Sequence, residues 1–386
     1  MKLGQMASYM NIGLPENIRK ILEDLQDNVP AIDAKQIERV VKEDLGQTPQ
    51  QIFAQWSNIP IAAASIGQVH RAMLKDGTPV AVKVQYPDIV RALKSDLSNA
   101  SIVGSLSSVL FRENDSSAIF EEIKDRLLEE CDYEHEAKNQ EYFASLYRGD
   151  RDILIPKVCC ALSSKRVLTT HLVEGQRFND FVAHSSQKER NRAGQIIHRI
   201  AYTSIFRHHL FNCDPHPGNY LFLNDNRVAF IDFGCVKRFR ADFIDRWSDL
   251  LCSVLEQDRP RFEARLLDLR IAPRREGFDF DYQYILSLYL YRPWIYNRPF
   301  RYTHDYVRES FRVLGFDNPN LLRTNVSKDF VFVNRLQWGL NSVLAILNAE
   351  ANWRRPMLHL LYGEGTKKWP PAHRLPTAPQ FVSDKQ

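Results

Sequence analysis

The sequence predicts an α+β fold made of a small β-rich part followed by a mainly helical part. Two strand-like groups, over residues 56–85 and 153–171, carry the first half of this prediction. Helical composition over 188–210 and over most of the chain beyond residue 240 carries the second half. At 386 residues the chain is long enough for two or three domains, each with its own core.

The composition is that of an ordinary soluble globular protein, with 44% hydrophobic and 25% charged residues. A net charge of +4 is too small and too dispersed to predict nucleic-acid binding. The sequence contains no apolar run of about 18 residues, so no transmembrane helix is predicted, and no signal peptide precedes the first motif. The six cysteines lack Cys-x-x-Cys and Cys/His metal spacing, which favours reduced thiols and a cytoplasmic protein.

Residues 1–55 are predicted to form a helical N-terminal extension. Asp33 with Gln36 is a helix start of capping-box character, and Thr48-Pro49 with Gln51 is a second one. The β-rich part follows directly after this extension.

One strand of the β-rich part carries a lysine. Thr78–Gln85 has the sequence Thr-Pro-Val-Ala-Val-Lys-Val-Gln, and it follows Asp76-Gly77, a hairpin turn signal. Ser65–Leu74 can form the partner strand. A lysine inside an apolar strand is costly unless it is paired, so Lys83 predicts a carboxylate partner. The alternative is a solvent-facing lysine on an edge strand.

The most informative stretch lies over residues 214–234. Asp214 is followed by Asn219, and a short hairpin with its turn at 224–226 then leads to Asp232-Phe233-Gly234. Kinase-like folds build a phosphoryl-transfer site in this way, because one carboxylate orients or deprotonates a nucleophile while an Asp and an Asn hold Mg²⁺ against the phosphates. With Lys83 upstream to pair the phosphates of ATP, the order of residues predicts a two-lobed protein-kinase-like fold.

The loop before the lysine strand is poor in glycine. Residues 60–68 have the sequence Pro-Ile-Ala-Ala-Ala-Ser-Ile-Gly-Gln, where ordinary protein kinases carry three glycines. Alanine has less access to positive φ than glycine, so we expect a stiffer loop that holds nucleotide differently. The alternative is a simple structural turn.

With these motifs the sequence resembles the UbiB/ADCK (AarF-like) family of atypical kinases over essentially its whole length. Lys2 and Gln5 lie in a segment similar to the family's Lys-x-Gly-Gln motif, and Glu130 and Asp132 in one similar to its Glu-x-Asp motif. The alanine-rich nucleotide loop of the family is matched by Ala62, Ala63, Ala64 and Ser65.

That resemblance implies binding of ATP and Mg²⁺. It further implies ATP hydrolysis or phosphoryl transfer to a small molecule or lipid, in support of isoprenoid-quinone biosynthesis. Lipids and quinone-pathway enzymes are the partners it suggests, together with peripheral contact at a membrane.

The resemblance also makes Glu136 the helix carboxylate that pairs with Lys83. A helix is predicted over 119–147, on which Asp132, Glu136 and Asn139 share one face. Glu130 lies about 200° from Asp132 on a straight helix, so the helix must bend if both face the nucleotide. The alternative for these acids is a solvated acidic face.

The segment 172–175 is predicted to be the hinge that holds adenine, which places Glu174 among the nucleotide-binding residues. The alternative is an ordinary exit from a strand.

Two motifs of ordinary protein kinases are missing from the sequence. Phe211-Asn212-Cys213 precedes Asp214 where those kinases carry His-Arg, and no Ala-Pro-Glu segment follows Gly234. A peptide substrate would therefore find little platform. By resemblance Lys2 and Gln5 also lie over the cleft, and the alternative for their segment is part of an amphipathic helix.

The expected domains are 1–55, an N-lobe with a helical insert at 56–175, a C-lobe at 176–368 and a disordered tail at 369–386. The first hypothesis for function is an ATP- and Mg²⁺-dependent phosphotransferase or ATPase. A nucleotide-sensing scaffold with negligible turnover is the second hypothesis. The third is a metabolite kinase of the aminoglycoside-phosphotransferase kind, which would need an acidic pocket among the C-terminal helices.

In the first hypothesis five side chains act together on the nucleotide. The lysine orients its phosphates, a helix carboxylate positions the lysine, one Asp acts as base or water orienter, and an Asn and a second Asp hold Mg²⁺. In that order the residues are Lys83, Glu136, Asp214, Asn219 and Asp232.

Overall fold

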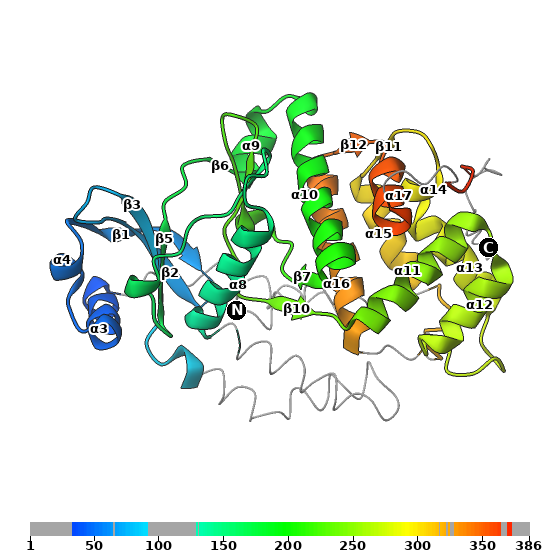
Figure 1. Cartoon of the computed structure of the whole chain (residues 1–386), viewed down its shortest axis with the longest axis horizontal. Helices are drawn as coiled ribbons and strands as arrows, with labels where there is room; N and C mark the ends of the chain where they lie inside the picture. The colour runs from blue at the N-terminus through cyan, green and yellow to red at the C-terminus, as the bar shows by residue number, and fades with distance from the viewer. Residues whose placement is uncertain are drawn as a thin grey trace. The chain divides into compact units, whose positions relative to one another are not determined.

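The computed structural model describes residues 33–64, 66–91, 129, 131–315, 317–321, 323–324, 328–363 and 369–372. The chain forms two compact units, which we describe separately (Figure 1). The N-terminal unit takes Met1–Phe178 and Gly218–Val236, and the C-terminal unit takes Asn179–Pro217 and Lys237–Gln386. The hairpin before Asp232-Phe233-Gly234 therefore belongs to the N-terminal unit.

An antiparallel sheet of four strands dominates the N-terminal unit. In spatial order the strands are β1 (Gln55–Ala64), β2 (Gly67–Met73), β3 (Pro79–Gln85) and β5 (Val167–His171). β3 is a central strand, and its alternate residues Val80, Val82 and Val84 are fully buried. The predicted lysine strand and its partner are confirmed. The turn between them has Gly77 at φ 86°, a conformation that favours glycine.

Two helices cover one face of this sheet. α3 (Ala34–Leu45) begins at Asp33, whose side chain accepts from the Lys35 N–H, and α4 (Pro49–Ile52) begins at Thr48. Ile37, Val40 and Val41 recur at helical spacing and join the valines of β3 in one apolar core. Both predicted helix starts are confirmed, while the rest of the predicted extension, residues 1–32, lies outside the described residues.

The alanine-rich segment is strand rather than loop as far as Ala64. β1 continues through Ala62 and Ala63, with irregular pairing to β2 between Trp56 and Ala62. A Cβ added to Gly67 would lie 2.2 Å from the Val84 carbonyl oxygen. Glycine is therefore required where β2 leaves this turn and passes close to β3.

The predicted helix over 119–147 is not continuous, because it is interrupted at Cys131 and Asp132. α8 spans Tyr133–Leu146 and begins at Asp132, which has extended backbone and caps the helix with its own carboxylate. Residues 119–128 and Glu130 lie outside the described residues. The cause of the difference is local, because an Asp side chain that accepts backbone N–H groups ends helical geometry at its own position.

A second sheet in the N-terminal unit carries the hairpin. Its order is β4 (Ile153–Leu154), β9 (Val228–Phe230), β8 (Tyr220–Phe222) and β6 (Gln176–Arg177). The short helices η1 (Cys160–Leu162) and η2 (Pro217–Asn219) lie before β5 and before β8. The predicted turn is confirmed, since Leu223 N–H donates to the Arg227 carbonyl and Asn226 has φ 66°.

The C-terminal unit is mainly helical, as predicted, with α10 as its longest described helix (Figure 1). Its helices are α9 (Phe178–His184), α10 (Gln187–His208), α11 (Ala241–Glu256), α12 (Arg259–Asp268), α13 (Phe280–Leu290), α14 (Arg292–Ile295), α15 (His304–Leu314), α16 (Lys328–Ile346) and α17 (Arg354–Tyr362). Its short strands are β7 (Leu210–Asn212), β10 (Val236–Arg238), β11 (Phe300–Arg301) and β12 (Glu350–Ala351).

Large aromatic side chains fill the centre of this unit. Trp294 and Trp353 surround the buried His198, and Trp294 donates its indole N–H to His198 Nε2 at 3.4 Å. The apolar stripe predicted on α16 is confirmed as core, because all its members are buried: Leu336, Leu340, Val343, Leu344 and Leu347. Residues 369–372, the start of the expected tail, contact α17 through Trp369 and His359.

In the part of the chain that the structure describes, no helix is both long and apolar enough to cross a bilayer. No disulfide joins any of the six cysteines.

Candidate active site

The centre of the candidate site is a lysine held by two carboxylates within the N-terminal unit. Lys83 Nζ donates to both carboxylate oxygens of Glu136 at 2.9 Å and lies 3.3 Å from Asp232 Oδ2. These residues come from β3, from α8 and from the segment after β9. The predicted carboxylate partner of Lys83 is therefore confirmed, and the alternative of a solvent-facing edge lysine is wrong.

The start of α8 explains why Glu136 serves as that partner. Asp132 accepts hydrogen bonds from the backbone N–H groups of Glu134 and His135, both at 3.1 Å, and so fixes where the helix begins. Glu136 then lies in the first turn, where the helix dipole favours a negative charge. Asp132 thus contributes to the site by capping the helix, and it does not share a helical face with Glu136 as predicted.

The charge state of the lysine follows from this pairing. Burial alone would lower the pKa of Lys83, but the negative charges of Asp232 and Glu136 raise it well above its usual value. Lys83 is therefore a cation throughout the physiological pH range, as a group that binds phosphate must be.

The three side chains differ in exposure. Glu136 is 1% exposed, whereas Lys83 is 16% and Asp232 24% exposed. A carboxylate sealed from solvent can position the lysine but cannot contact a ligand, while the lysine and the aspartate both reach the surface. The arrangement presents one cation and one oxygen donor on its open side.

The hairpin brings Asn219 next to Asp232. Ile231 N–H donates to the Asn219 carbonyl at 3.1 Å, which extends the pairing of β8 and β9 up to the residue before Asp232. Gly234 N–H donates to Asp232 Oδ1 at 3.0 Å and orients that carboxylate. Carboxylate and amide oxygens are ligands that suit Mg²⁺, so Asp232 and Asn219 fit the predicted role.

α8 also holds the segment that contains Asp232. Asn139 Nδ2 donates to the Phe233 carbonyl at 3.2 Å, and the rings of Phe143 and Phe233 lie 5.1 Å apart. Glu136 and Asn139, three residues apart on one helix face, therefore contact both Lys83 and the Asp-Phe-Gly segment.

Asp214 lies in the C-terminal unit, on the loop after β7. Its N–H donates to Asn212 Oδ1 at 3.4 Å, and its carbonyl accepts from the His216 N–H at 2.8 Å. The next residue, Pro215, packs on α16 at Gly339, where an added Cβ would lie 2.3 Å from Pro215 Cγ. Sequence reasoning missed Gly339, because nothing local marks a helix glycine as the contact of a loop more than a hundred residues away.

The other predicted site residues make no described contact with Lys83, Glu136 or Asp232, or they lie outside the described residues. Ala62 and Ala63 lie on β1, and Ala64 ends that strand. Glu174 is an exposed side chain that pairs with Arg71 at 2.8 Å, and Leu172 N–H donates to the Pro79 carbonyl. Lys2, Gln5, Ser65 and Glu130 lie outside the described residues.

Tyr133 is a second residue that sequence reasoning missed. Its ring lies under Lys83, with Nζ 4.9 Å from the centroid, and it is fully buried. Among the described residues its hydroxyl has no hydrogen-bond partner. Burial raises the pKa of Tyr133, so the ring is a neutral support for the cation. Its place at the first position of α8, three residues before Glu136, was the signal that the sequence offered.

Within the described ranges no three His, Cys, Asp or Glu side chains are grouped to hold a metal ion.

Comparison with known proteins agrees with this geometry. A family model described as the ABC1 atypical kinase-like domain matches residues 24–265, more than half of the chain. The chain belongs to the ABC1 atypical kinase family. The predicted UbiB/ADCK membership is confirmed, because relatives named AarF domain-containing protein kinase and COQ8 match as well.

Two curated relatives show how similar in sequence the chain is to other members of the family. "Probable serine/threonine-protein kinase abkD" of Dictyostelium discoideum is 34% identical over 265 residues, which are 66% of this chain and 38% of that protein. "Atypical kinase coq-8, mitochondrial" of Caenorhabditis elegans is 32% identical over 267 residues, 68% of this chain and 35% of that protein. The match thus spans little more than a third of these relatives' length.

A solved structure is similar over nearly the whole chain. It is titled "The complex structure of Rv3197-erythromycin from Mycobacterium tuberculosis", and it covers 94% of this chain and 92% of its own at 26% identity, with a TM-score of 0.73. The predicted α+β, two-lobed kinase-like fold is confirmed.

Proposed function

We propose that this atypical kinase is an ATP- and Mg²⁺-dependent ATPase or phosphotransferase. The observation that carries the proposal is Lys83, partly buried on β3, paired with Glu136 at 2.9 Å and placed 3.3 Å from Asp232. A lysine that serves only the fold needs one partner, whereas this lysine is shared between a sealed acid and an accessible one. Kinase-like sites require that arrangement to hold phosphates.

Each residue has a part that follows from its placement. Lys83 would bind the phosphates with its permanent charge, and Glu136 would keep it in place. Asp232, oriented by the Gly234 N–H, would hold Mg²⁺ together with Asn219, and the ion would neutralise charge on the phosphates. Asp214 would orient or deprotonate the attacking group. Ala62, Ala63 and Ala64 would bring β1 close to the nucleotide, with Glu174 at the hinge.

For the acceptor we propose water, a small molecule or a lipid, in support of isoprenoid-quinone biosynthesis. The relative named coq-8 and the lack of an Ala-Pro-Glu segment after Gly234 support this choice over a peptide. Lipids and quinone-pathway enzymes are accordingly the proposed partners, through peripheral contact with a membrane.

Nucleotide dependence tests the proposal first. Thermal unfolding is measured with ATP and with ADP, each with and without Mg²⁺, and phosphate release is then measured with phosphatidylcholine vesicles that contain or lack ubiquinone. We expect nucleotide to raise Tm more with Mg²⁺ than without, and the protein to release phosphate. Stabilisation without phosphate release would favour the scaffold, and the absence of any nucleotide response would contradict both.

Asp232→Asn tests the assignment of residues. It should lower Mg²⁺-dependent phosphate release by at least about 100-fold, because the proposed ion loses its charged ligand. Asp225→Asn is the matched control, since Asp225 lies in the turn of the same hairpin and pairs with Arg227 at 2.7 Å. Unchanged release by a folded Asp232→Asn variant would refute the assignment.

A further inference from the structure

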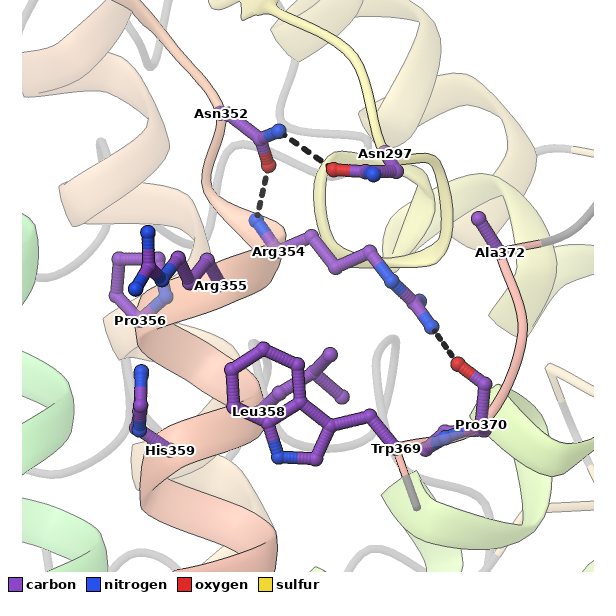
Figure 2. Close-up of a pocket in the computed structure, with 10 residues that line it drawn as sticks. All are labelled: Asn297, Asn352, Arg354, Arg355, Pro356, Leu358, His359, Trp369, Pro370 and Ala372. Carbon is purple, nitrogen blue, oxygen red and sulfur yellow. Dashed lines mark hydrogen bonds between the residues drawn. The ribbon is translucent and has the colours of Figure 1, made fainter. Parts of the chain in front are cut away.

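The C-terminal unit contains a pocket that the proposed nucleotide site does not use. It has a volume of about 920 Å³ and is lined by the start of α17, the chain around Asn297 and residues 369–372 (Figure 2). Pockets of this size hold small molecules in other proteins. Lys83, Glu136 and Asp232 do not line it.

One wall of this pocket is a buried arginine. Arg354 is 3% exposed, and its guanidinium donates to the carbonyls of Trp294 at 2.8 Å, Ile295 at 3.0 Å and Pro370 at 2.5 Å. In Figure 2 its side chain crosses the pocket from α17 to Pro370. These contacts use three of the five guanidinium N–H groups but do not cancel the charge, because carbonyl oxygens are dipoles.

Among the described residues, those that line the pocket carry positive charge and include no acid. Its lining includes Arg354, the exposed Arg355 and His359, but no Asp or Glu. Within the part of the chain that the structure describes, Arg354 has no carboxylate partner, and burial lowers its pKa. A charge in a low-dielectric wall acts more strongly on a ligand than one in water.

The rest of the lining is apolar or neutral. Leu358 and Trp369 both line the pocket (Figure 2), and the Trp369 ring is nearly perpendicular to the ring of His359, with centroids 4.8 Å apart. On the rim, Asn352 donates to Asn297 at 2.8 Å. A ligand that matches this lining needs both an anionic group and an apolar body.

We propose that this arginine pocket binds an anionic group, phosphate or carboxylate, carried on an apolar body. Arg355 contacts the anion, Arg354 adds its charge from the wall, and Trp369 packs against the body. The site is independent of the proposed nucleotide site, so its failure would leave that proposal standing.

Tryptophan fluorescence and calorimetry of the whole chain test the pocket, with inorganic phosphate, phenyl phosphate and dihexanoyl phosphatidate as probes in the presence of saturating ATP and Mg²⁺. We expect phenyl phosphate or dihexanoyl phosphatidate to bind at least tenfold more tightly than inorganic phosphate. Binding of the first indicates a soluble phosphate, and binding of the second alone a lipid headgroup. The fluorescence change should disappear in Trp369→Phe.

Arg355→Glu should weaken this binding at least tenfold. Its control is Arg308→Glu on α15, which makes the same change of charge at an exposed arginine outside the pocket lining and should stay within twofold of the unmodified protein. Arg354 is left intact, since its three carbonyl contacts also serve the fold. No binding, equal binding of inorganic phosphate, or equal loss in both variants would each overturn the proposal.

Discussion

Lys83 in the N-terminal unit is a partly buried cation and Arg354 in the C-terminal unit a fully buried one, and the chain compensates their charges differently. Lys83 has two carboxylates within 3.3 Å, and they raise its pKa well above the usual value. Arg354 has three carbonyl partners and a lowered pKa. The lysine needs acids, because desolvation would otherwise neutralise it, whereas a guanidinium keeps its proton with dipoles alone.

The difference in charge compensation indicates which kind of ligand each of the two sites can bind. Around Lys83 the two carboxylates exceed the single cation, so phosphates are repelled there unless a divalent cation arrives with them and offsets part of the negative charge. Around Arg354 the described residues provide carbonyl partners and no carboxylate, so an anion alone suffices. The following predictions test the comparison, from the largest expected effect to the smallest.

Removing the sealed acid should do the most damage. Glu136→Gln leaves Lys83 buried with one carboxylate, and we expect a loss of about 3–5 kcal/mol in the free energy of unfolding. Urea unfolding measures it. Glu134→Gln, an exposed acid in the same helical turn, should change stability by less than about 0.5 kcal/mol. Similar values for the two variants would mean that the lysine does not depend on its pair.

Arg354→Lys keeps the charge but loses the planar fork that reaches three carbonyls. We expect a loss of about 2–3 kcal/mol, since an ammonium group replaces only part of these hydrogen bonds. Arg355→Lys at the neighbouring exposed position is the control and should be nearly neutral. If urea unfolding shows no loss for Arg354→Lys, charge alone holds the wall of the pocket.

His198 extends the comparison to a buried base that stays neutral. Burial lowers its pKa to about 3, from 6.5 when exposed. Between pH 6.5 and about 3 the unfolded chain is therefore protonated at His198 while the folded chain is not. The free energy of unfolding decreases as the pH is lowered through that window. When the pH is lowered from 7 to 5, the free energy of unfolding of the unmodified protein, measured by urea unfolding, should fall by about 2 kcal/mol more than that of His198→Gln.

The control for this pH dependence is His304→Gln, at an exposed histidine, which should keep the acid-dependent loss unchanged. The same slope for His198→Gln and the unmodified protein would show that other groups cause the acid sensitivity.

Tyr133→Phe should have the smallest effect. Its hydroxyl is buried without a partner among the described residues, so removing it should change stability by less than about 1 kcal/mol, and a gain is allowed. Tyr306→Phe is the matched control, because that hydroxyl donates to the Leu290 carbonyl at 2.9 Å, and it should cost about 1 kcal/mol. A large loss in Tyr133→Phe would indicate that the hydroxyl has a partner after all.

Local patterns in the sequence were enough for much of the fold and the centre of the site. Valines alternating around Lys83 predicted β3, and the turn at 224–226 predicted the hairpin before Asp232. A lysine inside an apolar strand predicted an acidic partner, and the resemblance to the atypical kinases identified that partner as Glu136.

Features that depend on distant contacts could not be predicted in this way. Gly339 matters through Pro215, and Arg354 matters through the carbonyls of Trp294, Ile295 and Pro370, all far away in the chain. The start of α8 was missed for another reason. A continuous helix and a helix that begins at Asp132 have the same helical spacing of residues. Periodicity alone therefore could not distinguish the two possibilities.

That cap at Asp132 affects how damage to this protein should be interpreted. Its carboxylate acts on backbone N–H groups, and through them it sets the rotation of the helix that presents Glu136 to Lys83. An inactive variant at this position would therefore not identify Asp132 as a ligand of nucleotide or metal. Asparagine caps helices about as well as aspartate. Tolerance of asparagine together with intolerance of alanine would therefore distinguish a mechanical role from a chemical one.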